Sequence, residues 1–211
     1  MNVPPKPRKT ELKRTTRETS ISIELDLDDP GRLEVRTGIG FFDHMLTALG
    51  SHGRMGLVID ATGDLDVDQH HLVEDVGIVL GSALREALGD DLRIRRFGHA
   101  YAPMDDALAR AVVDLSGRGF LHYGVSIQRP AVGGLETDLV LEFFQAFASN
   151  ARLNLHLDLL RGENAHHQLE ALFKATALAL RDAVTREACL RDVPSTKGKL
   201  SEQAAQEKPP R

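Results

Sequence analysis

The chain has 211 residues, with 26 Lys and Arg against 31 Asp and Glu, which gives a formal net charge of −5 at pH 7. This length predicts one domain or two small fused units, and 42% hydrophobic residues suffice for a buried core. Nine His stand beside a single Cys, Cys189, which excludes a disulfide scaffold, a thiolate zinc ribbon and an iron–sulfur cluster. Any metal site must therefore use imidazole and carboxylate ligands.

The first residues differ in charge from the rest of the chain. Residues 1–17 carry a charge of +5, so the remainder carries −10. A basic arm can bind nucleic acid, but this one is short, rich in Pro and free of aromatic residues. We therefore expect residues 1–12 to form a flexible, solvated arm without a nucleic-acid partner. No apolar run approaches the roughly 20 residues of a membrane helix or resembles a signal segment, so we expect a cytoplasmic protein without a membrane partner.

The first half of the chain alternates between strand and helix patterns. Residues 19–27 alternate with period two and predict a half-buried strand, with residues 33–37 as a possible hairpin partner. Helical spacing predicts a helix over residues 41–49 and a strand over residues 55–61. Asp68 is a good N-cap for a long helix that ends near Leu88.

The second half repeats this order. We expect strands over 107–115 and 120–127, a loop at 130–134, a helix over 139–149, a strand over 152–158 and a long helix from the Asn164 cap to about Glu187. Residues 199–211 are expected to form a flexible tail.

Side chains also match between the two halves. Phe41-Phe42 matches Phe143-Phe144, and Ala, Leu, Arg and Ala coincide at a fixed offset in the two long helices. We therefore expect an α+β fold of two repeated units, residues 13–95 and 96–198, fused into one body.

Both long helices begin with the motif His-His-x-x-Glu. The first His and the Glu are four residues apart, so they share a helix face and could bind one ion. Neighbouring residues diverge by about 100°, so the second His should reach another ion, shared with a second copy of the motif. With two additional His as further candidates, the expected ligands are His44, His70, His71, Glu74, His156, His166, His167 and Glu170.

The ligand types limit the choice of metal, and other residues near these motifs have weaker expected roles. His and carboxylate ligands suit Mn²⁺, Fe²⁺, Co²⁺ or Zn²⁺, and the sequence does not choose among them. The acidic flanks of the first motif (Asp64, Asp66, Asp68 and Asp75) would ease cation binding, but we expect most of them to be simply solvated. His99 and His122 are expected to be ordinary surface or core residues.

Cationic loops indicate a phosphate ligand. No nucleotide-binding glycine motif is present, but Arg and Lys lie in the segments 95–98, 117–119 and 194–198. Arginine forks and a Ser-x-Lys segment can together bind a small phosphate dianion.

A series of motifs occurs in order over roughly Lys13 to Leu200. They include Thr37-Gly38-Ile39-Gly40-Phe41-Phe42-Asp43-His44, both His-His-x-x-Glu motifs, Pro103-Met104-Asp105, Asp114-Leu115-Ser116-Gly117-Arg118, Glu142-Phe143-Phe144 and Pro194-Ser195-Thr196-Lys197-Gly198. Together and in this order, these motifs resemble the imidazoleglycerol-phosphate dehydratase family. Two departures, Asp106 in place of the usual Glu and Gly119 in place of a frequent Pro, are expected to affect only local loop shape.

The resemblance implies a metal-dependent lyase of histidine biosynthesis. Such an enzyme dehydrates D-erythro-imidazole glycerol phosphate to imidazole acetol phosphate with two Mn²⁺ per active site. It also implies a homo-oligomer of twenty-four subunits with active sites at subunit interfaces. Each half would be a four-stranded sheet packed on helices, similar to domain 2 of ribosomal protein S5.

The reaction explains why metal is needed. The proton to be removed sits on an unactivated carbon, which no ordinary base deprotonates unaided at neutral pH. A metal on a ring nitrogen lowers the pKa of that nitrogen and stabilises an imidazolate, which can push electrons into the side chain and expel the hydroxyl. We assign Glu18 as the proton-transfer base. The expected catalytic residues are Glu18, Glu74, Glu170 and Lys174, and the expected substrate-binding residues are Glu18, His52, Arg96, Arg118, Lys174, Ser195 and Lys197.

Three other classes of protein could also carry repeated His and Glu. A metal-storage protein would place Glu-x-x-His on a four-helix bundle, whereas this chain has strand patterns. A metalloprotease would use one His-Glu-x-x-His motif. A metal-dependent assembly module stays open, although it leaves the cationic loops unexplained, and chelation separates it from an enzyme.

Overall fold

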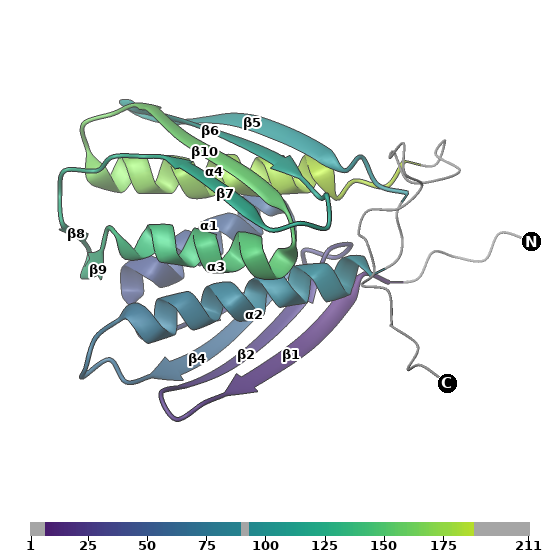
Figure 1. Cartoon of the computed structure of the whole chain (residues 1–211), viewed down its shortest axis with the longest axis horizontal. Coiled ribbons are helices and arrows are strands. Elements are labelled where there is room, and N and C mark those ends of the chain that lie inside the picture. The colour runs from purple at the N-terminus through teal and green to yellow at the C-terminus, as the bar shows by residue number, and fades with distance from the viewer. Residues whose placement is uncertain (1–6, 90–92, 188–211) are drawn as a thin grey trace, which may run out of the picture.

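Two four-stranded sheets enclose four helices in the computed structural model, which describes residues 7–89 and 93–187 (Figure 1). The first sheet has the order β1-β2-β4-β3, and the second has the order β5-β6-β10-β7. The strands are β1 (Lys9–Thr15), β2 (Thr19–Asp26), β3 (Leu33–Arg36), β4 (Gly56–Gly63), β5 (Phe97–Met104), β6 (Ala107–Asp114), β7 (Phe120–Gly124) and β10 (Asn154–Arg161).

The helices fill the space between the sheets, where α2 packs on the first sheet and α4 on the second. The two halves join through α2 against α3 and α1 against α4. A small hairpin of β8 (Ala131–Val132) and β9 (Leu135–Glu136) lies at the end where α2 and α4 begin (Figure 1). The helices are α1 (Gly40–Gly53), α2 (His70–Leu88), α3 (Leu139–Ala151) and α4 (Ala165–Ala183).

The identical strand order of the two sheets confirms the internal repeat and the α+β class. In each half, the first two strands pair antiparallel, and the strand between the two helices joins the sheet beside the second strand. In each half the remaining strand pairs parallel with that inserted strand. In the sequence, the elements of the first half (β1 to α2) end before residue 95, and those of the second half (β5 to α4) begin after residue 96.

The expected hairpin between residues 19–27 and 33–37 is wrong. β3 pairs in parallel with β4, with Leu33 beside Leu57, whereas β2 lies between β1 and β4. A parallel pair satisfies the backbone of β3 while leaving both edges of β2 to longer partners.

Part of the expected flexible arm is instead strand β1, which begins at Lys9. Thr10 is buried and Leu12 is partly buried toward the helices, while Lys9, Glu11 and Lys13 are exposed on the other face. Arg8 is also buried, and its guanidinium binds the Asp28 carboxylate at 2.6 Å. The dense charge hides the alternation, because one of the inward positions is itself charged: Arg14 binds Asp75 of α2 at 2.7 Å.

Strand β5 was not predicted, because its pattern is inverted. Phe97 and Tyr101 are exposed on the outer face, whereas the inward residues are Gly98, Ala100, Ala102 and the partly buried Met104. A Cβ at Gly98 would lie 2.0 Å from the carbonyl oxygen of Ala179. The inward side chains at the start and middle of β5 are therefore small, because α4 packs almost directly on the backbone at Gly98.

Helix ends differ from the expected ones by a few residues. Helix α1 continues to Gly53, and α4 ends at Ala183 rather than near Glu187. Gln69 occupies the N-cap position of α2, although the Asp68 carboxylate accepts the N–H of His70. Asn164 caps α4 as expected.

Four phenylalanines link the helices at the centre. Phe173 of α4 lies with its ring centroid 5.5 Å from Phe143 and 4.9 Å from Phe144, and Phe42 of α1 contacts Phe143 at 5.4 Å. All four are essentially inaccessible to solvent. None of the described helices is both long and apolar enough to cross a bilayer.

Candidate active site

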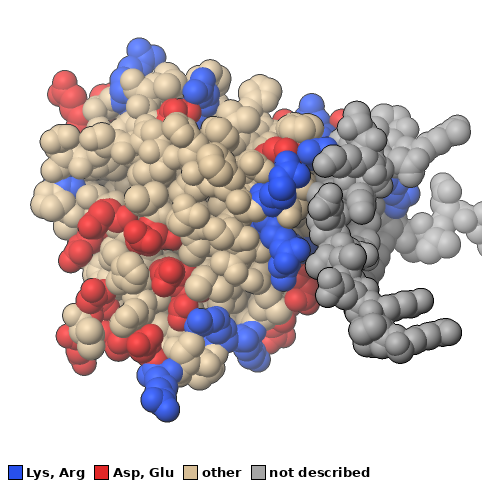
Figure 2. Space-filling view, viewed as in Figure 1, with Lys and Arg blue, Asp and Glu red and all other residues tan. Residues whose placement is uncertain are grey.

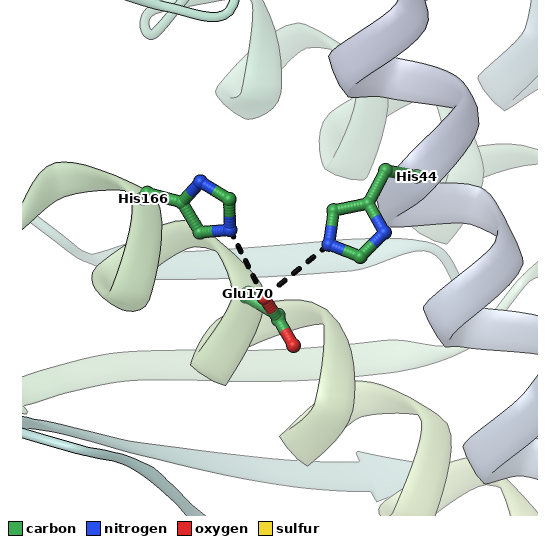
Figure 3. A group of neighbouring side chains, drawn as sticks. All are labelled: His44, His166 and Glu170. Atoms are coloured by element: carbon green, nitrogen blue, oxygen red, sulfur yellow. Dashed lines mark hydrogen bonds and ion pairs between the residues drawn. The ribbon is translucent and has the colours of Figure 1, made fainter.

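Two histidines and a glutamate converge between α1 and α4 (Figure 3). The Nε2 atoms of His44 and His166 lie 3.3 Å and 3.1 Å from the same oxygen of Glu170, Oε2. One ligand atom from each residue lies within 4.8 Å of the other two. The expected pairing of His166 with Glu170 across one helical turn is present, and His44 joins it from a helix far away in sequence.

The other oxygen of Glu170 binds Lys174, whose Nζ lies at 2.6 Å from Oε1. Burial raises the pKa of the Glu170 carboxyl, but hydrogen bonding to Lys174, its charge, and hydrogen bonds from the two histidines outweigh burial and lower the pKa to about 2. Burial and the nearby positive charge of Lys174 lower the pKa of His52, in the last turn of α1. Helices α1 and α4 therefore bring together five of the predicted site residues: His44, His52, His166, Glu170 and Lys174.

The start of α4 sets this geometry. Asn164 accepts the backbone N–H groups of His166 and His167, at 2.9 Å and 3.4 Å, so the motif occupies the first helical turn. Adjacent positions then diverge, and the two imidazole ring centroids lie 6.1 Å apart.

His167 faces the turn between β5 and β6. Its Nδ1 donates to the Asp106 carboxylate at 2.6 Å, and its Nε2 lies 3.5 Å from the exposed Asp105. The expectation that Asp106 affects only loop shape is therefore wrong, because the Asp106 carboxylate contacts a motif histidine directly.

The first motif has a different environment. His71 Nδ1 donates to Asp64 at 3.1 Å and lies 4.0 Å from the exposed carboxylate of Glu18. The hydrogen bond to Asp64, together with the charge of Glu18, raises the pKa of His71 above its usual value despite some desolvation. Within the described chain, His70 and Glu74 make no hydrogen bond or ion pair with each other, so the expected clasp is absent from this motif.

His156 lies on the outer face of the second sheet. Its strand neighbours Leu155 and Leu157 are fully buried toward the helices, whereas His156 is exposed beside His122, with ring centroids 5.3 Å apart. The structure therefore does not bring His156 to the His44–His166–Glu170 group within one chain.

The two arginines of the expected phosphate clamp lie at the far end of the second half. The N–H of Arg96 donates to the carbonyl of Ala183, which a rise of about 1.5 Å per residue places roughly 20 Å along α4 from Glu170. The carbonyl of Arg118 accepts from Asn154, at the start of β10, whereas α4 begins after the end of that strand. One chain therefore does not bring the arginines to the metal-ligand group.

The two arginines differ in their exposure to solvent. The Arg96 guanidinium is mostly buried, binds Asp114 at 2.7 Å and 3.2 Å and lies 4.8 Å from the centroid of the Phe97 ring. Arg118 is exposed in the turn after β6. Ser195 and Lys197 lie outside the described residues.

The surface charge of one face is also divided. Figure 2 shows acidic side chains gathered over the left end, where α2 begins, and a group of Lys and Arg toward the opposite end.

The donor set of His44, His166 and Glu170 fits a divalent ion, because two imidazole nitrogens and a carboxylate oxygen converge on one point. The two sheets exclude the four-helix bundle of a ferritin-like storage protein.

Comparisons with known proteins agree on one family. The family model described as imidazoleglycerol-phosphate dehydratase matches residues 37–180. Relatives of that name from Salinibacter ruber and Acidiphilium cryptum are 57% and 56% identical, each over 92% of this chain and covering 96% and 99% of their own lengths. The crystal structure of imidazoleglycerol-phosphate dehydratase from Staphylococcus aureus matches with a TM-score of 0.78 and 43% identity, over 85% of this chain and 99% of that one.

Proposed function

The chain belongs to the imidazoleglycerol-phosphate dehydratase family, and from this premise we propose how its residues carry out the reaction. The enzyme is a lyase of histidine biosynthesis that removes water from imidazole glycerol phosphate and yields imidazole acetol phosphate. The observation that carries the site assignment is the convergence of His44, His166 and Glu170 from two helices.

These three residues would hold one of two Mn²⁺ ions, and the remaining motif ligands (His70, His71, Glu74 and His167, with His156) would serve the second ion and complete the first. A bound divalent ion would supply Lewis acidity, which lowers the pKa of a substrate ring nitrogen and so helps the ring to donate electrons as the neighbouring hydroxyl departs. Lys174 keeps Glu170 ionised by its 2.6 Å ion pair, so that the carboxylate is ready as a ligand near neutral pH.

Glu18 is the proposed proton acceptor. Its carboxylate is more than half exposed, in the turn before β2, and Oε2 lies 4.0 Å from His71 Nδ1. An exposed carboxylate next to a motif histidine can take a proton from the substrate side-chain carbon as the hydroxyl departs from the neighbouring carbon. The resulting enol becomes the ketone of the product.

Arg96 and Arg118 are the proposed phosphate ligands, with Ser195, Lys197, Lys174 and His52. Asp114 holds the Arg96 guanidinium by two hydrogen bonds, which limits its rotation, and Arg118 is exposed and able to approach an anion.

The active site is proposed to be shared between copies of the chain. The supporting observation is the separation, within one chain, of the arginines from the histidine group by a distance longer than the glycerol chain of the substrate. Contacts between copies can close this gap, which favours the twenty-four-subunit shell that the family resemblance implies. A cytoplasmic location is also proposed, since a chain with one Cys has no internal disulfide to maintain.

The decisive experiment is a dehydratase assay on imidazole glycerol phosphate with chelator and Mn²⁺ add-back. Loss of product with chelator and recovery with Mn²⁺ are expected. A metal-dependent assembly module would instead dissociate on chelation without ever having formed the acetol product. Absence of product from the metal-replete protein would overturn the proposal.

A further inference from the structure

We propose that Asp64 and Asp106 are paired positioning residues, each of which fixes the ring of the second histidine of a motif so that its Nε2 faces outward as a metal ligand. The inference rests on the proposed metal role of His71 and His167. It concerns the carboxylates behind the histidines, which the motif itself does not contain.

The first contact lies in the turn between β4 and α2. Asp64 Oδ2 accepts from Nδ1 of His71 at 3.1 Å, and its Oδ1 lies at 3.3 Å from the same nitrogen. The Asp64 side chain is about a quarter exposed, so the pair is partly shielded from water. The backbone of Asp64 makes the turn, with its N–H bonded to Glu18 and its carbonyl to Val67, which leaves the carboxylate for the histidine.

The second contact comes from a different part of the repeat. Asp106 lies in the turn between β5 and β6, and its Oδ1 accepts from Nδ1 of His167 at 2.6 Å. Its Oδ2 accepts the backbone N–H groups of Glu163 and Asn164 at 2.6 Å and 3.0 Å. One carboxylate therefore holds both the entry to α4 and the histidine in its first turn.

The two carboxylates do not occupy equivalent places in the repeat. Asp64 follows the strand that precedes its own motif, whereas Asp106 follows the first strand of the second sheet. The turn equivalent to that of Asp106 in the first half carries Glu18, 4.0 Å from the same nitrogen of His71. In both halves, Nδ1 of the second histidine thus lies next to a carboxylate, although that carboxylate comes from a different turn in each half. This points to a requirement of the histidine itself.

That requirement follows from imidazole chemistry. A carboxylate on Nδ1 selects the tautomer with the proton on that atom, which leaves the lone pair on Nε2 for a metal. The carboxylate also fixes the ring orientation and increases the basicity of the ligand atom. The first histidine of the second motif differs, because His166 directs Nε2 to its own Glu170 and has no such support in the described structure.

Asp64→Ala is the cleanest test, because the side chain of Asp64 makes only the contact with His71 among the described residues. Mn²⁺ binding to the purified full-length protein should weaken by about 10- to 100-fold, measured from the free-ion signal in electron paramagnetic resonance. Asp66→Ala is the matched control: it removes an equal charge two residues away, from an exposed side chain without a hydrogen bond or ion pair in the described structure, and should leave Mn²⁺ affinity unchanged.

Asp106→Asn and Asp106→Glu test the second contact. The Asn variant keeps an acceptor for the backbone of α4 but loses the charge, so Mn²⁺ binding should weaken at least about 10-fold, while the Glu variant should stay within about 3-fold of the wild type. In both weakened variants, excess Mn²⁺ should restore kcat, which a merely structural defect would not permit. Unchanged thermal unfolding would show that the fold is retained.

Unchanged Mn²⁺ affinity in Asp64→Ala and Asp106→Asn, with normal binding by the wild type, would overturn this inference and leave the proposed function intact. A kcat that excess Mn²⁺ fails to restore would also overturn it. A wild-type protein that binds no Mn²⁺ would overturn both the metal role and the inference.

Discussion

A site shared between copies is best tested with two variants that each lack one part of it. Glu170→Gln damages the group of His44, His166 and Glu170, and Arg118→Ala removes an exposed cation from the other end of the same half. Each variant alone should be nearly inactive at low substrate concentration. Co-expression of the two in equal amounts should restore activity.

The magnitude follows from the lengths of the elements. β10 rises about 3.3 Å per residue, so it separates Arg118 at its start from the beginning of α4 by roughly 23 Å. The glycerol chain of the substrate, with bonds of about 1.5 Å, spans less than about 10 Å, so one chain cannot supply both parts of a site. Random mixing then gives intact Glu170 from one copy and intact Arg118 from another in about one quarter of the sites.

The assay is product formation by the co-expressed mixture, compared with each variant alone. A matched control combines Glu170→Gln with His166→Ala, because both residues belong to one group within one chain and every such group in the mixture carries a defect. Recovery to about one quarter of wild-type activity is expected in the first mixture only. No recovery there, or equal recovery in the control, would refute the shared site.

Three further predictions concern single residues. Glu18→Gln should lower kcat by at least about 100-fold with Mn²⁺ content unchanged, and an active variant would remove Glu18 as the base. Phe173→Ala should lower the free energy of unfolding by about 3–5 kcal/mol in urea titrations, against less than about 1 kcal/mol for the half-exposed Phe120→Ala, since only Phe173 is buried among other rings. Burial raises the pKa of Asp28, but the hydrogen bonds and charge of Arg8 outweigh burial and lower the pKa overall. The ionised pair therefore stabilises the fold above pH 3.8, and this stabilisation is lost as the pH falls through the lower folded-state pKa. Asp28→Asn should therefore cost about 2 kcal/mol at pH 7 and almost nothing in acid, and a pH-independent cost would contradict this account.

Much of the fold could be predicted because its signals are local. The period of 3.6 in α2 and α4, the Asn164 cap and the alternation of β2 depend only on neighbouring residues. Strand pairing depends on residues distant in sequence, so the partner of β3 was predicted wrongly. Strand β5 was missed because the close approach of α4 reverses its expected pattern of inward and outward side chains.

The candidate site, like the fold, could be predicted from the sequence only in part. Spacing of four residues on a helix was enough to pair His166 with Glu170, and two copies of the motif were enough to indicate metal. The same spacing fails for His70 and Glu74, whose side chains do not meet in the described structure. Sequence spacing therefore predicts which residues share a helix face, but not which side chains converge.

Residue type and local periodicity are enough to indicate the repeat, the kinds of candidate ligand and the lack of a thiolate cluster. The packing of the elements places His44 beside the second motif, Asp106 beside His167 and His156 on the outer face of its sheet. It also decided that the arginines lie about 20 Å from the histidine group. These relations depend on how helices and sheets pack, because packing brings together residues that are distant in the sequence, such as Asp106 and His167, 61 positions apart, or His44 and Glu170, 126 positions apart.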